Sequence, residues 1–305
     1  MLFQKKHTTL PESTGYDRAE QQYKKKSQFP EMWRRLKKQK SAMVGLIIFV
    51  AVLLIAVFAS FIVPYDRAIA QIPDERLLSP CAAHPFGTDA YGRDILARII
   101  WGARYSLLSG ISAVIVGFII GGLLGAITGY YGGMVDSVIM RILDTLMCIP
   151  FFVLALAIVA ALGTGFVNVM LALVISSIPT YARIVRSAIL NVVDMDFIEA
   201  AKACGTPNIV IILKHVLPNA IGPIIVQTTM SVGQMIKDTA AMSFLGMGIQ
   251  PPAPEWGSML SEGKAYMLYN AWMVVFPGLA ITITSLALNL MGDGLRDALD
   301  PRLKD

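Results

Sequence analysis

The chain has 305 residues, of which 55% are hydrophobic and 15% are charged, whereas soluble domains carry about 25% charged residues. This composition excludes an ordinary soluble domain and a disordered chain. The net charge of +5 does not indicate nucleic-acid binding, because residues 1–41 hold 11 of the 26 Lys and Arg and only 4 of the 21 Asp and Glu. The sequence therefore predicts a basic tail followed by a charge-poor body embedded in membrane lipid.

Six apolar stretches are predicted to cross the membrane. The first, 42–63, has no charge and Pro64 follows it, and as a helix it spans about 33 Å. Only Gly163-Thr164-Gly165 separate the third stretch from the fourth, which predicts a tight antiparallel hairpin. We therefore expect an all-α integral membrane protein with six transmembrane helices. The remaining five stretches are 107–131, 145–162, 166–181, 220–236 and 271–291.

Lys and Arg are unevenly distributed between the two sides of such a bundle. With the tail inside, the inner segments hold 19 of them and the outer segments 7, and such an excess is typical of the cytoplasmic side. We therefore expect both termini to be cytoplasmic, an assignment that rests largely on the tail. The expected organisation is a basic tail (1–41), a first anchor helix (42–63), an extracytoplasmic loop (64–104), a transmembrane core (105–291) with an inner loop (182–219), and a C-terminal tail (292–305).

Glycine recurs every four residues along the second stretch. A strip of a helix without side chains lets a neighbouring backbone approach closely. Such a helix-packing seam either slides between transport states or is ordinary packing, and in both cases the second span is predicted to be buried among other helices. The strip consists of Gly117, Gly121, Gly125, Gly129 and Gly133.

The inner loop is predicted to form two helices with a sharp corner between them. Asp196 and Glu199 have the spacing of a capping box, and Gly205 is suited to end that helix in a left-handed conformation. Thr206-Pro207 is expected to begin the second helix, which Pro218 ends. A short helix across the end of a membrane bundle suits either docking in another protein's groove or contact with lipid headgroups, and the local pattern leaves both open.

Several motifs resemble the permease subunits of bacterial ABC importers. Glu199-Ala200-Ala201, Gly205 and Leu217-Pro218 are similar to the EAA loop of that family, including its spacing. The resemblance runs from about residue 34 to the C-terminus and is greatest to the C subunits of dipeptide permeases. Motifs similar to the dipeptide/oligopeptide/nickel group occur at 84–89, 92–94, 244–248, 250–252 and 255–257, and a motif similar to its C subunits occurs at 292–301.

This resemblance implies a type I ABC importer permease of the cytoplasmic (inner) membrane that imports short peptides. The implied partners are a homologous second permease subunit, two cytoplasmic ATPase subunits and an extracytoplasmic substrate-binding protein. Glutathione, heme or nickel chelates are alternative cargoes of similar subunits, and no substrate-binding residue is predicted. The implied ATPase-coupling residues are Glu199, Ala200, Ala201, Lys202, Gly205, Leu217 and Pro218.

Two other classes of protein are less compatible with the sequence. An ion-coupled secondary transporter needs ionisable residues near the membrane centre, and the second, fourth and sixth predicted spans contain none. A membrane enzyme needs a cluster of catalytic side chains, and no convincing cluster is present. The chain is therefore not expected to be an enzyme.

No cofactor or metal site is expected in this chain. The run from Gly257 to Gly263-Lys264 has five intervening residues where a Walker A loop has four, and Ala265 lacks the hydroxyl that contacts Mg²⁺. ATP and Mg²⁺ are therefore expected in the partner ATPases. Neither the histidines nor the cysteines have metal-ligand or disulfide spacing. These residues are His7, His84, His215, Cys81, Cys148 and Cys204.

Charged pairs flank two of the predicted spans. Arg141 and Asp144 lie three residues apart on one helix face, which suits an ion pair at the headgroup level or a gate at the inner mouth. Lys237-Asp238 is expected to contact the binding protein, close an outer gate or form a pair at the membrane edge. Lys202 and Lys214-His215 are expected to be solvated charges or contacts at the rim of the coupling surface.

Overall fold

The computed structural model describes residues 28–299, so most of the predicted basic tail, His7 and residues 300–305 lie outside the described residues. Between 28 and 299 the regular structure is helical, which confirms the all-α prediction. Within these residues, five helices are long and apolar enough to cross a membrane, and the bent pair of α6 and α7 is a sixth candidate if it counts as one span. The candidate spans are α3 (Lys40–Ile62), α5 (Ile95–Tyr131), α8 (Phe166–Val193), α11 (Leu217–Phe244), α13 (Trp272–Leu299) and the bent pair α6 (Gly133–Met147) with α7 (Phe151–Leu162).

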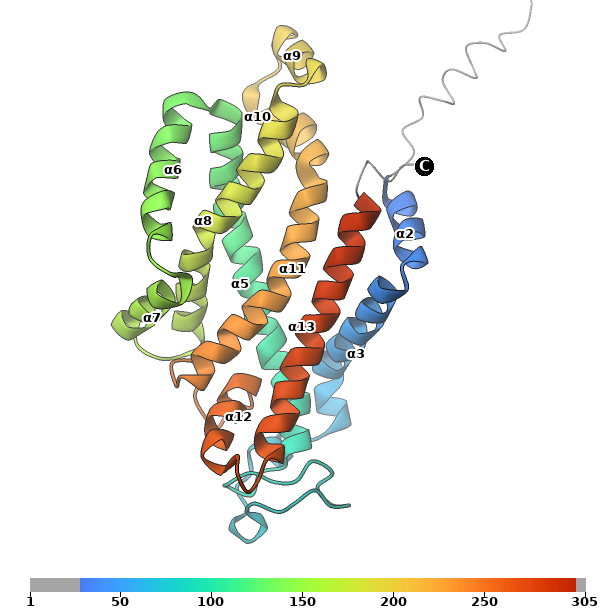
Figure 1. Cartoon of the computed structure of the whole chain (residues 1–305), viewed down its shortest axis with the longest axis vertical. Coiled ribbons are helices and arrows are strands. Elements are labelled where there is room, and N and C mark those ends of the chain that lie inside the picture. Colours follow the sequence, from blue (N-terminus) through green and yellow to red (C-terminus); the bar gives the residue numbers. More distant parts are fainter. Residues whose placement is uncertain (1–27, 300–305) are drawn as a thin grey trace, which may run out of the picture.

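Shorter helices gather at the two ends of the elongated bundle (Figure 1). One end carries α9, α2 and the last turns of α13, and it is called the α9 end below. The opposite end carries the 64–94 segment and α12, and it is called the α12 end. The short helices are α2 (Gln28–Lys38), α4 (Tyr65–Ile69), η1 (Pro73–Glu75), α9 (Asp196–Ala203), α10 (Asn208–Val210), η2 (Ile211–Val216), α12 (Trp256–Gly263) and η3 (Lys264–Tyr266).

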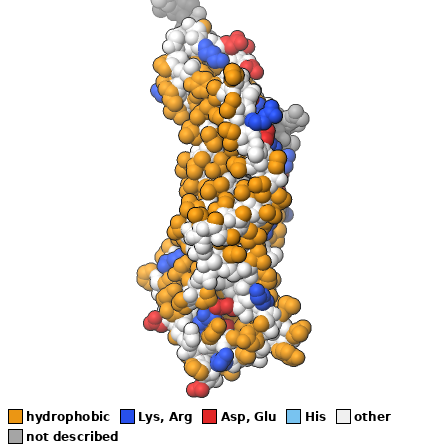
Figure 2. Space-filling view, turned by 90° about the vertical axis from the view of Figure 1, so that its left-hand side faces the viewer, with side chains coloured by type: hydrophobic (Ala, Val, Ile, Leu, Met, Phe, Trp, Pro, Cys, Tyr) orange, Lys and Arg blue, Asp and Glu red, His pale blue; other side chains and the backbone are white. Residues whose placement is uncertain are grey.

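The surface of the bundle is apolar along its middle. In Figure 2, hydrophobic side chains cover the central part of the visible face, while charged side chains gather toward both ends. The first span shows the same property, since α3 is among the most apolar helices and exposes Ile47, Val57 and Phe61. A surface of this kind requires lipid around it. The N-terminal segment that directly precedes α3 is itself helical as α2, which the sequence did not predict.

The glycine strip of α5 lies against α8. A Cβ atom added to Gly121 would lie 2.8 Å from the carbonyl oxygen of Ile178, and one added to Gly125 would overlap the carbonyl oxygen of Ala182. Gly117 and Gly129 also face α8 residues. The backbones of α5 and α8 therefore approach too closely for any side chain between them.

Gly133 does not belong to this strip, so its assignment to the helix-packing seam is wrong. The helix α5 ends at Tyr131, and both Gly132 and Gly133 have positive φ. No atom lies within 4 Å of a Cβ built on Gly133. The chain turns here into α6 because glycine tolerates this backbone conformation.

The prediction of a continuous third span at 145–162 is also wrong. Helices α6 and α7 are separated at Cys148–Pro150 and bent by 83°. Pro150 has no N–H and disfavours helical geometry at the preceding residue, so α7 begins only at Phe151. The predicted glycine-rich connection joins α7 to α8, and the two helices pack through Ala155, Val159 and Val169.

Other helices extend beyond their predicted bounds. The α5 helix begins at Ile95 instead of the expected 107, because the side chain of Asp94 caps it by accepting a hydrogen bond from Ala97 N at 2.9 Å. Part of the predicted outer loop at 64–104 is therefore helical. Both α8 and α11 continue past their predicted ends at 181 and 236.

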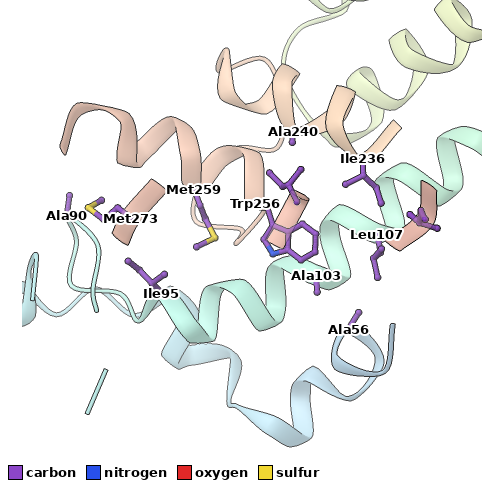
Figure 3. Close-up of a cluster of buried hydrophobic side chains, with 12 residues drawn as sticks. Ala56, Ala90, Ile95, Ala103, Leu107, Ile236, Ala240, Trp256, Met259 and Met273 are labelled. Atoms are coloured by element: carbon purple, nitrogen blue, oxygen red, sulfur yellow. The ribbon is translucent and has the colours of Figure 1, made fainter. Parts of the chain in front are cut away.

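A hydrophobic cluster around Trp256 joins α12 to α5 (Figure 3). The indole Nε1 donates a hydrogen bond to the Ile99 carbonyl at 3.0 Å. Gly102 allows this approach, since a Cβ there would lie 2.7 Å from Trp256 Cδ1.

Glu255 begins α12 by accepting hydrogen bonds from the backbone N–H of Gly257 and Ser258, each at 2.8 Å. Burial raises the pKa of the Glu255 carboxyl, although these hydrogen bonds oppose the shift.

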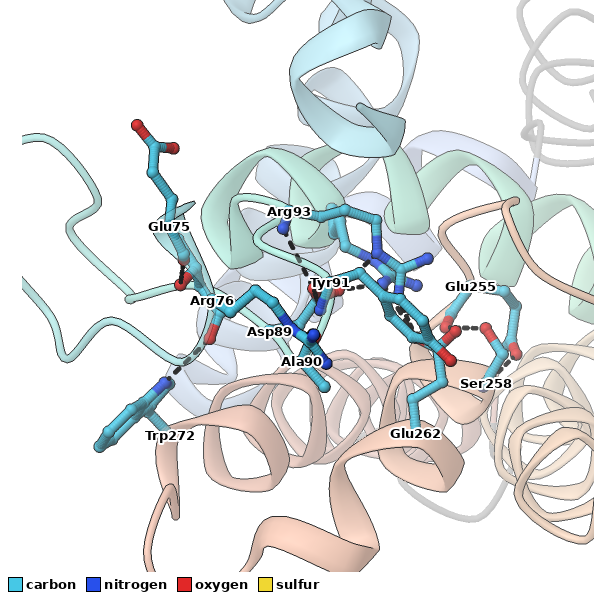
Figure 4. Close-up of polar contacts among 12 residues, drawn as sticks. Glu75, Arg76, Asp89, Ala90, Tyr91, Arg93, Glu255, Ser258, Glu262 and Trp272 are labelled. Atoms are coloured by element: carbon cyan, nitrogen blue, oxygen red, sulfur yellow. Dashed lines mark hydrogen bonds and ion pairs between the residues drawn. The ribbon is translucent and has the colours of Figure 1, made fainter. Parts of the chain in front are cut away.

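Buried charges tie the loop before α5 and the first turn of α5 to α12 (Figure 4). Asp89 accepts from Arg93 at 2.6 Å and from Arg98 at 2.5 Å. Glu262, on α12, pairs with the same two arginines at 2.7 and 2.9 Å. The guanidinium groups are almost fully buried, with 2% and 1% of the side chains exposed. Opposite charges thus hold two segments together that are far apart in the sequence.

Candidate functional site

The helix α9 lies at the extreme tip of the α9 end (Figure 1). Its N-cap is Met195, whose carbonyl accepts a hydrogen bond from Ile198 N at 2.8 Å. The predicted capping box is therefore wrong, because Asp196 is the first helical residue and makes no side-chain cap. Asp196 and Glu199 still occupy the first turn, where negative charge is favoured by the helix dipole.

Gly205 forms the corner after α9. Its φ is +73°, and Gly205 N donates to the Lys202 carbonyl at 3.0 Å while Thr206 N donates to the Ala201 carbonyl at 3.1 Å. These two bonds form a Schellman motif, which ends a helix at a left-handed residue. No atom lies within 4 Å of a Cβ built on Gly205, so glycine is required here by the backbone conformation and not by close packing.

The segment after the corner differs from its prediction. Pro207 is the N-cap of α10, where Thr206 was expected, and the helix does not end at Pro218. It passes through the π-helical turn η2 and continues as the span α11, with Pro218 in the first turn of α11. The wider π turn fits the proline, which lacks an N–H and would clash with a carbonyl in a regular α-helix. The corner is therefore continuous with a membrane-spanning helix.

The corner is anchored on one face and uncovered on the other. Ile198 and Ile211 are fully buried against Ile189 and Val185 of α8, together with Ala126 of α5. On the outer face, apolar side chains remain open to solvent, with 40% of Phe197, 61% of Ile209 and 56% of Leu213 exposed.

The predicted coupling residues are divided between these two environments. Ala201 and Leu217 are half-buried beside the anchored face. The remaining five are exposed: Glu199, Ala200, Lys202, Gly205 and Pro218. An exposed surface that combines apolar and acidic side chains in this way is suited to binding a partner.

Tyr130 is a contact residue that the sequence did not indicate. Its hydroxyl donates to Asn208 Oδ1 at 2.8 Å, and Lys202 Nζ lies 5.6 Å from the ring centroid. Tyr130 is distant in the sequence from both Lys202 and Asn208, and no local pattern connects it to them. Lys202 is thus exposed but is not merely solvated, because it lies over an aromatic face.

Ion pairs between helices also lie toward the α9 end. Arg186 of α8 binds Asp136 of α6 with two hydrogen bonds of 2.6 Å, and Arg183 pairs with Asp144 at 2.5 Å. The expected pairing of Arg141 with Asp144 is therefore wrong. These contacts attach α6 to the same helix, α8, that supports α9.

Lys237 and Asp238 do not form the expected pair. Lys237 is exposed, whereas Asp238 is buried in α11 and accepts a hydrogen bond from Gln234 Nε2 at 2.9 Å.

No group of three or more His, Cys, Asp or Glu able to hold a metal ion occurs within 28–299. His84 contacts Glu75 and Asp94 at the α12 end, and the cysteines within that range are free and exposed.

A groove of about 760 Å³ lies at the α9 end of the bundle. It is formed by the last residues of α8, the first turns of α11, the end of α13 and α2. Its lining is mixed, with Met195, Gln227 and Arg296 among the contributing side chains. The α9 end thus combines an uncovered helical corner with an adjacent depression.

Comparison with known proteins identifies the family. Residues 121–305 match the binding-protein-dependent transport system inner membrane component family, and residues 27–80 match the N-terminal transmembrane domain of oligopeptide transport permease C. The chain is 46% identical to the dipeptide transport system permease protein DppC of Alkalihalophilus pseudofirmus, with 93% of each chain covered. It is 45% identical to the glutathione transport system permease protein GsiD of Escherichia coli, with 90% of each covered.

A solved structure supports the same fold. A chain of the inward-facing MetNI methionine ABC transporter aligns with a TM-score of 0.55 at 21% identity, and the match covers 67% of the present chain and 96% of that chain. At this identity the likeness concerns the fold alone. Together with the membrane-spanning helices, the sequence matches show that this chain is a multi-pass inner-membrane permease of the binding-protein-dependent ABC importer family, of the oligopeptide permease C type.

Proposed function

We propose that this permease imports short peptides and that α9 and the corner at Gly205 transmit the action of a cytoplasmic ATPase. The observation that carries the proposal is the uncovered outer face of the corner, which combines Glu199 with the exposed Phe197 and Ile209. Apolar and acidic groups on a short rigid helix suit insertion into a groove on another protein. Because η2 and α11 continue from the corner, a displacement of α9 reaches a membrane span directly.

The proposed assembly contains this chain, a homologous second permease subunit, two ATPases and an extracytoplasmic binding protein. ATP and Mg²⁺ are bound by the ATPases. The α9 end faces the cytoplasm in this proposal, with both termini on that side, because the basic segments before α3 favour the cytoplasmic side. The predicted division into tail, anchor, outer loop, core and C-terminal tail follows from the same orientation.

Peptides are the proposed cargo because DppC is named as a dipeptide permease and matches 93% of the present chain. The GsiD match supports a second candidate, glutathione, which is itself a small peptide-like molecule. Uptake of labelled dipeptide and labelled glutathione by the reconstituted complex separates these candidates. Uptake of neither substrate in the presence of ATP and the binding protein would refute the proposed cargo class.

The orientation is testable with the native cysteines. Cys81 lies in the segment at the α12 end and Cys204 lies at the corner, and both are exposed. In variants that keep only one of them, a membrane-impermeant maleimide should modify Cys81 in right-side-out vesicles and Cys204 in inside-out vesicles. The reverse labelling would show that the proposed orientation is wrong.

The coupling role is tested with Glu199→Lys. Reversing the charge in the first turn of α9 disfavours the helix by about 0.3–1 kcal/mol. It also removes the acidic group that is proposed to contact the ATPase. Peptide-stimulated ATP hydrolysis and uptake should both fall in the reconstituted complex, while Asp293→Lys, on the exposed side of α13, serves as the control. Uptake that is driven by a proton gradient without an ATPase would refute the proposal.

A further inference from the structure

Tyr130 occupies an unusual position at the junction between a membrane span and the corner. It is the last residue but one of α5, which ends where Gly132 adopts a φ of +61°. Its ring is half-buried beside the cluster that seats α9 and η2 on α8. The residue therefore lies where the α5–α8 seam meets the proposed ATPase-binding surface.

The two polar contacts of Tyr130 reach opposite sides of the corner. Lys202, over the ring face at 5.6 Å, belongs to α9 before Gly205. Asn208, which accepts from the hydroxyl at 2.8 Å, begins α10 after Gly205. One side chain thus contacts both helices that meet at the corner.

The corner has an apolar anchor but no polar contact at the glycine itself. Ile198 and Ile211 seat the segments on either side of the corner against α8, whereas Gly205 has a φ of +73° and no neighbouring atom within 4 Å of a Cβ position. The Schellman bonds end α9 but do not fix the direction of the next helix. Tyr130 adds a directional polar restraint from a different element, α5.

The restraint also connects the corner to the rest of the bundle. From Tyr130, α5 runs along α8 through the glycine strip and reaches the Trp256 cluster at the α12 end. Close backbone packing of this kind transmits displacement as a rigid unit. A movement of α9 therefore has a second route into the membrane besides η2 and α11.

We propose that Tyr130 is a positioning residue that links the corner at Gly205 to α5 and thereby couples ATP hydrolysis to transport. This inference rests on the proposed function, because it assigns a route for motion that begins at the ATPase. It predicts that loss of the hydroxyl contact leaves the complex assembled and able to hydrolyse ATP. The defect should appear in the number of peptides imported per ATP.

The test compares Tyr130→Phe with Tyr131→Phe in the reconstituted complex. Tyr130→Phe keeps the ring under Lys202 and removes only the hydrogen bond to Asn208, whereas the exposed Tyr131 is a matched control on the next residue. The ratio of peptide imported to ATP hydrolysed should fall about three- to ten-fold in Tyr130→Phe, the range expected for one hydrogen bond, and should be unchanged in Tyr131→Phe. Co-purification of the ATPase with the permease should be equal in both.

A second variant identifies the partner of the hydroxyl. Asn208→Ala should lower the same ratio of peptide imported to ATP hydrolysed. The Tyr130→Phe/Asn208→Ala double variant should show the same ratio as either single variant, because all three lack the same hydrogen bond. An unchanged ratio in Tyr130→Phe, additive losses in the double variant, or equal losses of hydrolysis and uptake would overturn the inference. If the wild-type complex shows no ATP-driven uptake, the proposed function fails instead.

Discussion

The glycine strip of α5 makes a quantitative prediction when two neighbouring positions are compared. A Cβ on Gly125 would overlap the Ala182 carbonyl oxygen and lie 2.9 Å from Arg186 N. A Cβ on Gly122, less than one turn away, would meet only Val185 Cγ2 at 3.6 Å, an ordinary contact. Substituting alanine at each position adds the same methyl group to the same helix, so the difference isolates the approach of α8.

The expected magnitudes follow from these distances. Replacing glycine by alanine inside a helix stabilises it by about 0.8–1 kcal/mol, and this gain applies to both positions. An added carbon in a tightly packed site costs about 1–3 kcal/mol, and that cost applies only to Gly125 because the obstructing atoms belong to backbone. We therefore expect Gly122→Ala to be neutral or stabilising, and Gly125→Ala to be less stable than Gly122→Ala by about 1–3 kcal/mol.

The assay is reversible unfolding of each purified variant in mixed micelles by titration with SDS, followed by circular dichroism. Gly125→Ala should unfold at lower SDS than Gly122→Ala. Equal unfolding free energies for the two variants would refute the conclusion that α5 and α8 are in close backbone contact at Gly125.

Three further changes test other parts of the structure. Glu262→Gln leaves the buried Arg93 and Arg98 with one fewer opposite charge, so the free energy of unfolding should fall by about 3–5 kcal/mol, as measured in the same SDS titration. Gly205→Val places a branched residue at a φ of +73°, which costs about 1–2 kcal/mol and should speed hydrogen exchange of the α9 amides, while Gly205→Asn should be tolerated. Burial raises the pKa of Glu255 in the folded state, so its contribution to stability is greatest below the pKa of the unfolded chain and declines as pH rises through the folded pKa. Glu255→Gln should flatten that decline in melting temperature between pH 4 and pH 8.

Each of these outcomes has a contrary result. If Glu262→Gln lowered the free energy of unfolding only slightly, the buried ion cluster would not be what holds α12 to α5. If the α9 amides of Gly205→Val exchanged hydrogen at the same rate as those of the native chain, the left-handed corner would not be required. If the melting temperature of the native chain rose relative to that of Glu255→Gln between pH 4 and pH 8, the raised pKa of Glu255 would be contradicted.

The elements that depend on local chemistry were predictable from the sequence. Apolar length identifies the spans, because a helix without charges over 42–63 has few alternatives to lipid. The period of four in the glycines predicts a close helix contact, which the structure shows at Gly121 and Gly125. The corner at Gly205 follows from the need for a left-handed residue after a short helix.

The errors arose where one local signal competed with another. Pro150 lies within the predicted third span, but the surrounding apolar residues favoured a continuous helix, and the structure breaks there instead. Pro218 was expected to end a helix, yet the π turn η2 accommodates it. The period of four in the glycines predicts a strip that includes Gly133, but the adjacent Gly132 favours a turn at this point.

Contacts between distant segments were outside the reach of the sequence. Arg186 binds Asp136 from another helix, and Asp144 pairs with Arg183 instead of its near neighbour Arg141. The contacts of Tyr130 with Lys202 and Asn208 also depend on how α5 meets α9 and α10. Such pairings are fixed by tertiary packing, and a single sequence carries no signal for them.

The proposed function requires that the ATPase binds to the corner at Gly205. Cys204 precedes this glycine and is exposed, so its rate of modification reports on that surface without a new label. In inside-out vesicles, a variant that keeps Cys204 alone should react rapidly with a maleimide when the permease subunits are present without ATPase, and at least ten-fold more slowly when the ATPases are bound. An equal rate with and without ATPase, while the complex remains assembled, would contradict the claim.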